Sequence, residues 1–350
     1  MGQKKVDVGV LGATGMVGQQ FLVELGAHPW FNLTWLGASE RSAGKRLAEA
    51  TSWRLPTPIP AGAADLLVDH VTPGRAPRVL FSGLDASVAG EVEEAFAAAG
   101  HIVISNARNH RLHAVVPLLV PEINPDHLGL LPAQARAHGW RGGIVTNPNC
   151  STVVLTMALA PLRQFGLRSV IVTTLQAVSG AGYPGLPSLD IIGNVVPFIG
   201  GEEEKMETET KKILGCNKGD WIEPHAITVS AHTTRVPVVN GHTEMISVSL
   251  ETPPPVEEVK AALVNFSGRP QQQRLPSAPP QPIVYLAEAN RPQPRLDADR
   301  DRGMTITIGR LRPCSVLNYK FVALGHNTVR GAAGAAVLNA ELMHVDSLLA

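Results

Sequence analysis

The chain has 350 residues, of which 44% are hydrophobic, and its 30 basic residues balance its 30 acidic residues. This length favours two domains. The charge is balanced and there is no basic run, which argues against a nucleic-acid partner. No apolar stretch approaches the roughly 20 residues of a membrane span, and the first residues lead directly into a strand-like segment, so we expect neither a membrane anchor nor a signal peptide.

The first predicted elements surround a glycine-rich turn. Residues 6–11 are typical of a buried strand, and residues 19–25 follow as a predicted helix. A glycine turn between them brings backbone N–H groups to the helix N-terminus, where a pyrophosphate can bind. A purely structural tight turn is the alternative. We expect the turn to bind a nucleotide through Gly12, Thr14, Gly15, Met16, Val17 and Gly18.

The second predicted strand, residues 33–38, ends in the polar segment Ser39-Glu40-Arg41-Ser42. In a doubly wound sheet this position meets the adenosine ribose of a dinucleotide. A carboxylate there favours NAD, whereas hydroxyls and a fixed positive charge suit the 2′-phosphate of NADP. We expect Ser39, Arg41 and Ser42 to bind that phosphate, although Glu40 is a feature against it. A solvated polar loop is the alternative.

Strands and helices continue to alternate up to residue 149. Residues 78–85 and 102–105 are predicted strands, and residues 86–99 between them are a predicted helix. This alternation predicts a Rossmann-type, doubly wound parallel sheet, whose strands point their carboxyl ends at the cofactor. We therefore expect the cofactor site to include Ser82, Gly83 and Asn106.

The segment around Cys150 has the pattern of a nucleophile. A β-rich run ends at Thr146, Pro148 forces a turn, and apolar residues at helical spacing follow, which places Cys150 near a helix start. Unpaired N–H groups and the helix dipole favour a thiolate there and could hold an oxyanion. We expect a low-pKa thiol that is alkylated at neutral pH faster than Cys216 or Cys314. A buried, inert cysteine is the alternative.

The spacing of the cysteines limits the environment of the protein. The chain has three of them, widely separated and without a CxxC pair. This pattern argues against a disulfide framework and against a metal site. A reducing, cytoplasmic location fits it best.

The pattern changes after the helix that follows Cys150. Predicted strands at residues 169–176, 243–250, 305–308 and 320–323 have few helices between them, so we expect an α+β domain with a mixed or antiparallel sheet. An exposed sheet of this kind favours a homodimer, or a homotetramer built from dimers. The helix predicted from Thr328 to Leu349 is apolar enough to pack onto the first domain. We therefore assign residues 1–149 and 328–350 to a nucleotide-binding domain and residues 150–327 to a catalytic and dimerisation domain.

Polar residues near the ends of these later elements could complete an active site. Gln176 ends a strand and precedes a flexible turn that starts with Ser179 and Gly180. Glu202 and Lys205 lie in an acidic run that opens a predicted helix, where capping is the alternative explanation of the charges. Arg235 and His242 flank a short turn, and a surface histidine is the alternative for His242.

These motifs together resemble the aspartate-β-semialdehyde dehydrogenase family, and most closely its archaeal and fungal branch. The resemblance covers nearly the whole chain, through the segments GATGMVG, PNCST, QAVSGAG, EEEK, RVPVVNGH and GHNTVRGAAG. It implies an NADPH-dependent conversion of L-4-aspartyl phosphate into L-aspartate 4-semialdehyde, a step of amino-acid biosynthesis that passes through a cysteine thioester.

The resemblance also implies a role for each residue. Cys150 would be the nucleophile, with Asn149 beside it, Gln176 orienting the substrate and His242 acting as the acid/base. Arg235 would bind the substrate carboxylate, Glu202 its amine, and Arg111 with Lys205 its phosphate, with Arg108 as the alternative to Arg111. We also expect Ser179, Gly180 and Asn327 at the cofactor.

Other classes of protein would use only some of these predicted site residues, or the same residues for a different substrate. A malonyl-CoA reductase of the same family is the nearest alternative, and N-acetylglutamyl-phosphate reductase is a more distant relative with the same cysteine chemistry. A cysteine hydrolase would use Cys150 and His242 but has no use for the nucleotide turn. A non-catalytic NADP sensor would not need Cys150, Gln176, Arg235 and His242 together.

Overall fold

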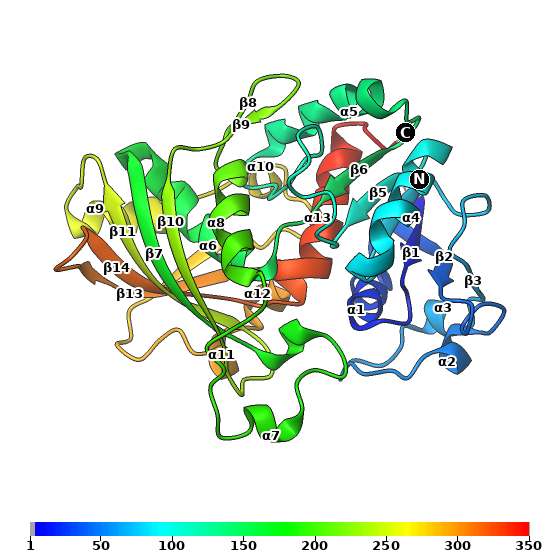
Figure 1. Ribbon diagram of the computed structural model, residues 1–350, viewed down its shortest axis with the longest axis horizontal. Coiled ribbons are helices and arrows are strands. Elements are labelled where there is room, and N and C mark those ends of the chain that lie inside the picture. The colour runs from blue at the N-terminus through cyan, green and yellow to red at the C-terminus, as the bar shows by residue number, and fades with distance from the viewer. Residues whose placement is uncertain (1–3, 350) are drawn as a thin grey trace.

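The computed structural model describes residues 4–349 and contains two six-stranded sheets, one in each half of the molecule (Figure 1). The N-terminal sheet lies on the right of Figure 1 in blue and cyan, and the second sheet lies on the left in green to orange. Within the described residues, no helix is both long enough and apolar enough to cross a membrane.

The first sheet is entirely parallel, with the strand order β3-β2-β1-β4-β5-β6. This order confirms the predicted doubly wound sheet, in which nucleotides bind where the strand order reverses. Its strands are β1 (Val6–Leu11), β2 (Phe31–Ala38), β3 (Val68–His70), β4 (Val79–Ser82), β5 (Ile102–Ser105) and β6 (Gly143–Thr146). Its helices are α1 (Met16–Leu25), α2 (Leu47–Ala50), α3 (Ala61–Ala64), α4 (Ala86–Ala99) and α5 (Leu131–His138), with the 3-10 turn η1 (Pro125–Leu130).

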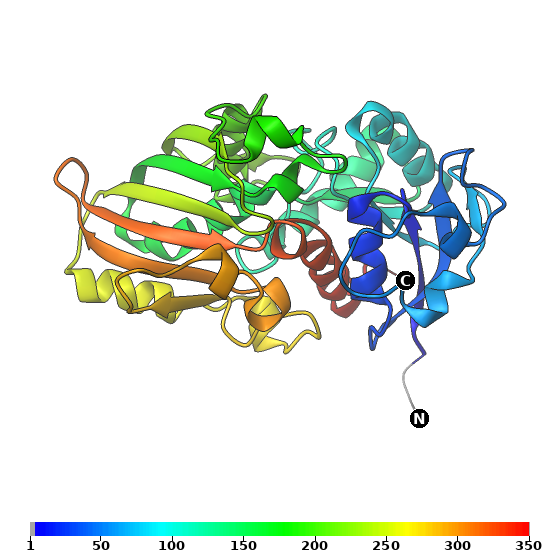
Figure 2. The ribbon, with the colours of Figure 1, turned by 90° about the horizontal axis from the view of Figure 1, so that it is seen from below.

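The C-terminal helix belongs to the packing of this first sheet, as its apolar sequence predicts. The π-helical turn η4 (Val329–Ala333) leads into α13 (Gly334–Val345). Val337 and Leu338 of α13 share a buried cluster with Val8 and Val10 of β1. Figure 2 shows α13, in dark red, next to α1 in blue. The chain therefore returns to its first sheet at its end.

The second sheet is mixed, with the order β10-β7-β11-β14-β13-β12. The β10–β7 and β12–β13 pairs are parallel and the remaining pairs are antiparallel. Its strands are β7 (Leu167–Gln176), β10 (Thr228–Arg235), β11 (His242–Leu250), β12 (Ile283–Leu286), β13 (Ile306–Pro313) and β14 (Tyr319–Gly325). A separate two-stranded sheet joins β8 (Cys216–Asn217) and β9 (Ile222–Glu223). These strands confirm the α+β architecture expected for the second half.

One face of the second sheet carries helices and the other is open. The helices α6 (Cys150–Leu159) and α8 (Glu202–Ile213) lie on the face turned toward the first sheet (Figure 1), and α9 (Val256–Val264) joins them in the same buried cluster. On the opposite face Ile171 and Met245 remain exposed. The shorter segments are η2 (Ala160–Phe165), η3 (Val178–Ala181), α7 (Ser188–Ile191), α10 (Arg269–Gln272), α11 (Pro294–Asp297) and α12 (Arg300–Gly303).

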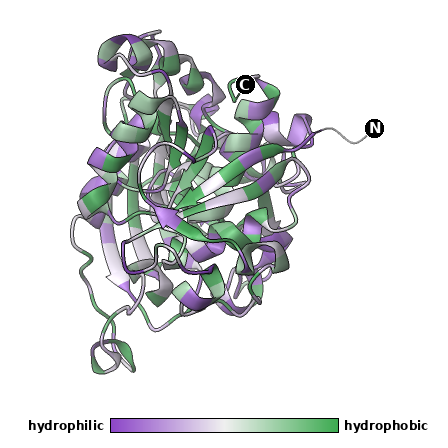
Figure 3. Cartoon of the chain, turned by 90° about the vertical axis from the view of Figure 1, so that its right-hand side faces the viewer, coloured by the Kyte–Doolittle hydropathy of each residue, from purple (hydrophilic) through white to green (hydrophobic). Residues whose placement is uncertain are grey.

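Hydropathy follows this layering. In Figure 3 the central strands are mostly hydrophobic, whereas hydrophilic segments gather on the outer helices and loops. Burial of the strands between helix layers is the main source of stability in such folds.

Candidate active site

Cys150 is the first residue of α6, and Asn149 is its N-cap. The Asn149 side chain accepts hydrogen bonds from the backbone N–H groups of Ser151 (3.0 Å) and Thr152 (3.2 Å). A side-chain cap of this kind satisfies N–H groups that a helix start otherwise leaves free. The sequence-based expectation that such groups could hold an oxyanion is therefore wrong for these two, because Asn149 occupies them.

Cys150 faces His242, the first residue of β11. The Cys150 Sγ lies 3.2 Å from His242 Nε2. His242 is fully buried, and its Nδ1 accepts a hydrogen bond from the backbone N–H of Ala177 at 3.1 Å. Because Nδ1 is an acceptor, the proton of the neutral ring belongs on Nε2. The imidazole therefore presents an N–H to the sulfur.

Burial favours the neutral form of both members of this pair. Burial raises the pKa of the Cys150 thiol above its usual range, and the Glu202 carboxylate adds to the shift, although part of Cys150 faces the pocket. Burial lowers the pKa of His242, and the charges of Arg235 and His326 act in the same direction. The expectation of a low-pKa thiol is corrected here, because loss of solvent outweighs the helix dipole and the nearby arginines.

Arg235 and Gln176 end two neighbouring parallel strands and pair directly with each other. The Arg235 Nη1 donates to the carbonyl of Ala177 at 2.7 Å. Gln176 is buried, and its Oε1 has no hydrogen-bond partner among the described residues. A Cβ added at Gly180 would lie 2.8 Å from Arg235 Nη1 and 3.0 Å from His242 Cε1. Glycine at this turn therefore lets the backbone lie against both side chains.

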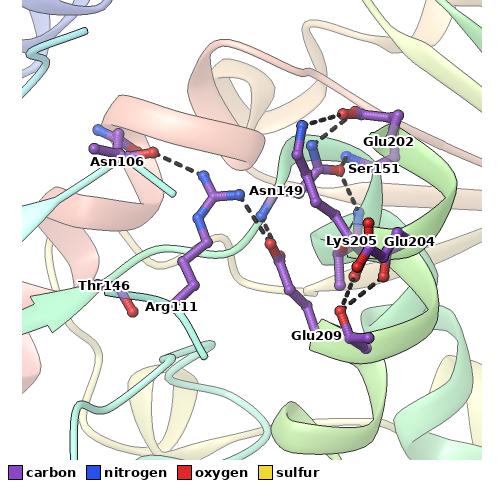
Figure 4. A network of polar contacts seen from close by, with 12 residues as sticks. Asn106, Arg111, Thr146, Asn149, Ser151, Glu202, Glu204, Lys205 and Glu209 are labelled. Carbon is purple, nitrogen blue, oxygen red and sulfur yellow. Dashed lines mark hydrogen bonds and ion pairs between the residues drawn. The ribbon is translucent and has the colours of Figure 1, made fainter. Parts of the chain in front are cut away.

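One face of α8 supplies the charged wall of the site (Figure 4). Glu202, Lys205 and Glu209 follow each other at helical spacing, so they share this face. The Glu202 carboxylate accepts from Asn149 Nδ2 (2.7 Å) and from Lys205 Nζ (3.0 Å). Glu209 accepts from Arg111 Nη1 at 3.0 Å and from the Asn149 backbone N–H at 2.6 Å.

Most of these residues line a pocket of about 860 Å³ between the two sheets, whereas Gln176, Glu209 and His242 are not part of its lining. Residues expected from the sequence and found in its lining are Met16, Val17, Asn106, Arg108, Arg111, Asn149, Cys150, Ser179, Gly180, Glu202, Lys205, Arg235 and Asn327. Further lining comes from segments that the sequence did not indicate, including residues 84–87, Phe198 and Gly331. Within residues 4–349, no cluster of His, Cys, Asp and Glu side chains is placed to hold a metal ion.

The glycine turn fits a dinucleotide. Gly12 has a φ of +76°, and a Cβ there would lie 2.8 Å from the Gly83 carbonyl oxygen, so only glycine adopts this turn without strain. Gly15 is the N-cap of α1 and has no side-chain capping bond. The first N–H groups of α1 thus have no side-chain acceptor from that cap, which suits a phosphate.

The remaining expected cofactor residues lie outside the pocket lining. The backbone N–H groups of Gly12 and Ala13 donate to the Gly37 carbonyl, which places the end of β2 against the glycine turn. In the segment that follows, Ser39 and Arg41 are exposed and Ser42 is buried. Ser82 is fully buried. Contacts from these residues, and from Gly12, Thr14, Gly15, Gly18 and Gly83, to a cofactor stay predictions.

The fold and the site together define a two-domain oxidoreductase in which a dinucleotide-binding sheet adjoins a cysteine–histidine pair. Residues 7–131 match the family described as the semialdehyde dehydrogenase NAD-binding domain, and residues 159–330 match the semialdehyde dehydrogenase dimerisation domain. The chain therefore belongs to the aspartate-semialdehyde dehydrogenase family, as its nearly full-length relatives also show.

Two of these relatives are the aspartate-semialdehyde dehydrogenases of Archaeoglobus fulgidus and Cryptococcus neoformans. The first is 49% identical, with 99% of this chain and 100% of the relative covered. The second is 50% identical, with 97% of this chain and 96% of the relative covered. The crystal structure of the Candida albicans enzyme with NADP matches with a TM-score of 0.90 at 41% identity, covering 99% of this chain and 100% of that one. The resemblance to the archaeal and fungal branch is confirmed.

Proposed function

We propose that the protein catalyses the NADPH-dependent reductive dephosphorylation of L-4-aspartyl phosphate to L-aspartate 4-semialdehyde. The observation that carries this proposal is the contact between Cys150 Sγ and His242 Nε2 at 3.2 Å, beside a pocket with four cationic side chains. A thiol attacks an activated acyl group, and the cations suit an anionic substrate. The names of the relatives described above support the same substrate.

The charged groups can hold such a substrate at each of its ends. Arg235 has donors to spare after its bond to Ala177, and its planar guanidinium can bind the substrate carboxylate at two points. Glu202 can accept from the substrate amine, and Gln176 has a free acceptor nearby. Arg111 and Lys205 line the same pocket and suit the phosphate. Arg108 also lines it but is exposed, so we assign the phosphate to Arg111.

The first chemical step joins Cys150 to the substrate. The sulfur attacks the acyl carbon, a carbon–sulfur bond forms, and the carbon–oxygen bond to phosphate breaks. The thiol proton leaves with the phosphate, whose negative charge Arg111 and Lys205 offset. A thioester on Cys150 remains, and Arg235 continues to bind the carboxylate of the attached substrate.

Reduction of this thioester requires a hydride, which the reduced nicotinamide of NADPH supplies when it is bound. The resulting thiohemiacetal oxyanion on Cys150 lies within reach of His242. Because Ala177 occupies Nδ1, the ring stabilises this oxygen as a neutral donor through Nε2–H. This is narrower than the acid/base role that the resemblance implies. Collapse of the oxyanion breaks the carbon–sulfur bond, releases the aldehyde and returns a thiolate that takes a proton from solvent.

The remaining assignments extend the proposal to the whole chain. Residues 1–149 and 328–350 form the NADP-binding domain, and residues 150–327 form the catalytic and dimerisation domain. Support comes from the glycine turn in the first sheet, from the packing of α13 and from the match of residues 159–330 to a dimerisation domain. The open sheet face with Ile171 and Met245 suits a homodimer or a homotetramer. Three free cysteines suit the cytoplasm.

The experiment supplies aspartate semialdehyde, phosphate and NADP⁺ and follows the absorbance of the reduced nicotinamide. We expect turnover that depends on phosphate and that is lost in the Cys150→Ser variant, while NADP⁺ binding remains. The comparisons do not favour a malonyl-CoA reductase. If coenzyme A supports the reaction and phosphate does not, the acyl-phosphate assignment is wrong.

A further inference from the structure

The carboxylate of Glu209 joins two parts of the site that are far apart in the sequence. Its Oε1 accepts from Arg111 Nη1 at 3.0 Å, and its Oε2 accepts from the backbone N–H of Asn149 at 2.6 Å. Glu209 is only 2% exposed, and Arg111 and Asn149 are also buried. One carboxylate therefore connects a cationic side chain of the pocket to the residue directly before Cys150 (Figure 4).

We propose that Glu209 is a positioning residue that fixes the phosphate-binding arginine relative to the attacking sulfur. This inference rests on the proposed function, because it requires Arg111 to bind the phosphate. The acyl carbon must reach the sulfur while the departing phosphate stays at the cation, so the cation and the sulfur must keep a set separation, and small errors in such geometry are costly. Glu209 provides this constraint within a single side chain.

A second hydrogen bond also fixes the position of the Arg111 side chain. The Arg111 Nη2 donates to the carbonyl of Asn106 at 2.7 Å. Its Nε is buried and has no hydrogen-bond partner among the described residues. A guanidinium has five N–H donors. Arg111 is thus anchored at both terminal nitrogens and keeps donors for an anion in the pocket that it lines.

The helix that carries Glu209 also holds the loop of Arg111. Lys212 is one turn further along α8, and its Nζ donates to the carbonyls of Arg111, His113 and Val116, each at 2.8 Å. The other arm of the connection reaches the N-cap of α6, whose side chain is in turn bound by Glu202. Helix α8 therefore sets the spacing between the arginine loop and the start of α6.

Another buried ion pair of the described residues lies away from the pocket and provides a comparison for the Glu209–Arg111 pair. Arg330 and Glu122 form a doubly hydrogen-bonded pair at 2.8 Å, both fully buried, and neither lines the pocket. Arg111, in contrast, lines the pocket together with Lys205. The Glu209–Arg111 pair differs because it leaves one member facing the space where the substrate binds.

Replacement of Glu209 by Gln separates positioning from charge. Gln has nearly the same size but offers one acceptor and one donor, so the amide N–H must face either Arg111 or the Asn149 N–H, donor against donor. Removal of the negative charge alone would strengthen phosphate binding, whereas loss of the anchor weakens it. If positioning dominates, the KM for phosphate rises.

The experiment uses the full-length protein with inorganic phosphate as the probe. The wild-type protein must first show phosphate-dependent reduction of NADP⁺; failure there refutes the proposed function and not the role of Glu209. For Glu209→Gln we expect the KM for phosphate to rise by about tenfold to hundredfold, the loss of one hydrogen bond to a charged group. The Kd for NADP⁺ should stay within about twofold if the variant is folded.

Two further variants keep this test decisive. Glu207→Gln is the matched control, because Glu207 lies on the same helix and accepts from the Ala231 N–H of β10 instead, so its KM for phosphate should not change. If Glu209→Gln does not fold, Glu209→Asp keeps the charge but is one methylene too short to reach both partners. The same rise in KM is then expected.

A double-mutant cycle with Arg111→Ala closes the argument. If Glu209 acts through Arg111, the double variant should lose little more kcat/KM for phosphate than Arg111→Ala alone. Multiplying losses would show that the two residues act independently, and an unchanged or lower KM in Glu209→Gln would show that Glu209 is only a counter-charge. Either result overturns the proposal.

Discussion

Gly331 is the residue at which a single methyl group should disturb Cys150, the proposed nucleophile. It lies in the π-helical turn η4 and lines the pocket, and a Cβ there would lie 2.6 Å from Cys150 Cβ and 3.0 Å from Cys150 Cα. Carbon atoms pack at about 3.5–4.0 Å. In the Gly331→Ala variant, η4 and the start of α6 must therefore move apart by about 1 Å.

This movement should change both stability and turnover. Overpacking of a buried contact costs about 1–3 kcal/mol of the free energy of unfolding. A displacement of about 1 Å at the reacting atom can lower the rate on the order of a hundredfold, because Cys150 Sγ leaves its position 3.2 Å from His242 Nε2.

The assay compares kcat and the urea midpoint of Gly331→Ala with those of Gly62→Ala. Gly62 lies in α3, and a Cβ there meets nothing within 4 Å. That control should have wild-type kcat and equal or slightly higher stability, since alanine favours a helix by about 0.5–1 kcal/mol over glycine. Wild-type kcat and an unchanged midpoint in Gly331→Ala would refute the reasoning.

Four other substitutions test separate parts of the site. Arg235→Lys should lower kcat/KM for the semialdehyde by about 2 kcal/mol, roughly thirtyfold, because a lysine cannot hold a carboxylate at two points; an unchanged value would exclude the clamp. His242→Asn should lower kcat with little change in KM, and by less than His242→Ala, because an amide can still donate; equal losses in both variants would contradict a donor role. Arg41→Ala should weaken binding of NADP by about tenfold and leave NAD unchanged, and an equal loss for both cofactors would make Arg41 structural. Burial raises the pKa of Glu244 well above its ordinary 4.5, and Glu202 acts in the same direction. The contribution of Glu244 to wild-type stability is therefore fully present below pH 4.5 and falls as the pH rises from there toward the raised pKa. This fall in the free energy of unfolding amounts to at most about 1.4 kcal/mol per pH unit, and it should be absent in Glu244→Gln. Urea unfolding at pH 5 and pH 8 can measure the difference.

Elements with strong local signals could be predicted closely from the sequence. The helix at residues 86–99 and the strand at residues 102–105 agree with the observed α4 and β5. Their boundaries are marked locally, since Asp85 caps the helix start and Gly100 ends it with a φ of +108°. Helix α1 begins three residues earlier than expected, at Met16, because its Gly15 N-cap provides no polar side-chain signal.

Segments without periodicity could not be predicted. The stretch from residue 269 to residue 300 contains β12 and the two short helices α10 and α11, but its many prolines and charges hide them. The Pro- and Ala-rich region of residues 46–76 likewise contains α2, α3 and β3. Such elements are held by contacts with the rest of the molecule and not by local preference.

The residues of the site were easier to predict than their interactions. Most of the residues expected at the substrate do line one pocket, because strand ends and helix starts carry recognisable patterns. Glu209 was missed, although its position seven residues after Glu202 places it on the same helix face, and this spacing was a usable signal. The neutral state of Cys150 was also missed, since burial depends on the whole fold.

A neutral cysteine–histidine pair is compatible with the chemistry because a thiolate is needed only when an acyl phosphate is in place. In the resting site Lys205 is paired with Glu202 and Arg111 with Glu209, and the lowering of the Cys150 pKa by Arg111 does not offset the effects of burial and Glu202. A bound phosphate group competes with both carboxylates for these cations and can accept the proton that the sulfur loses. Coupling deprotonation to the arrival of the substrate in this way keeps Cys150 unreactive toward other electrophiles. Burial is the main cause of the raised pKa of the thiol, and Glu202, which belongs to the charged wall that prepares the site for phosphate, adds to the shift.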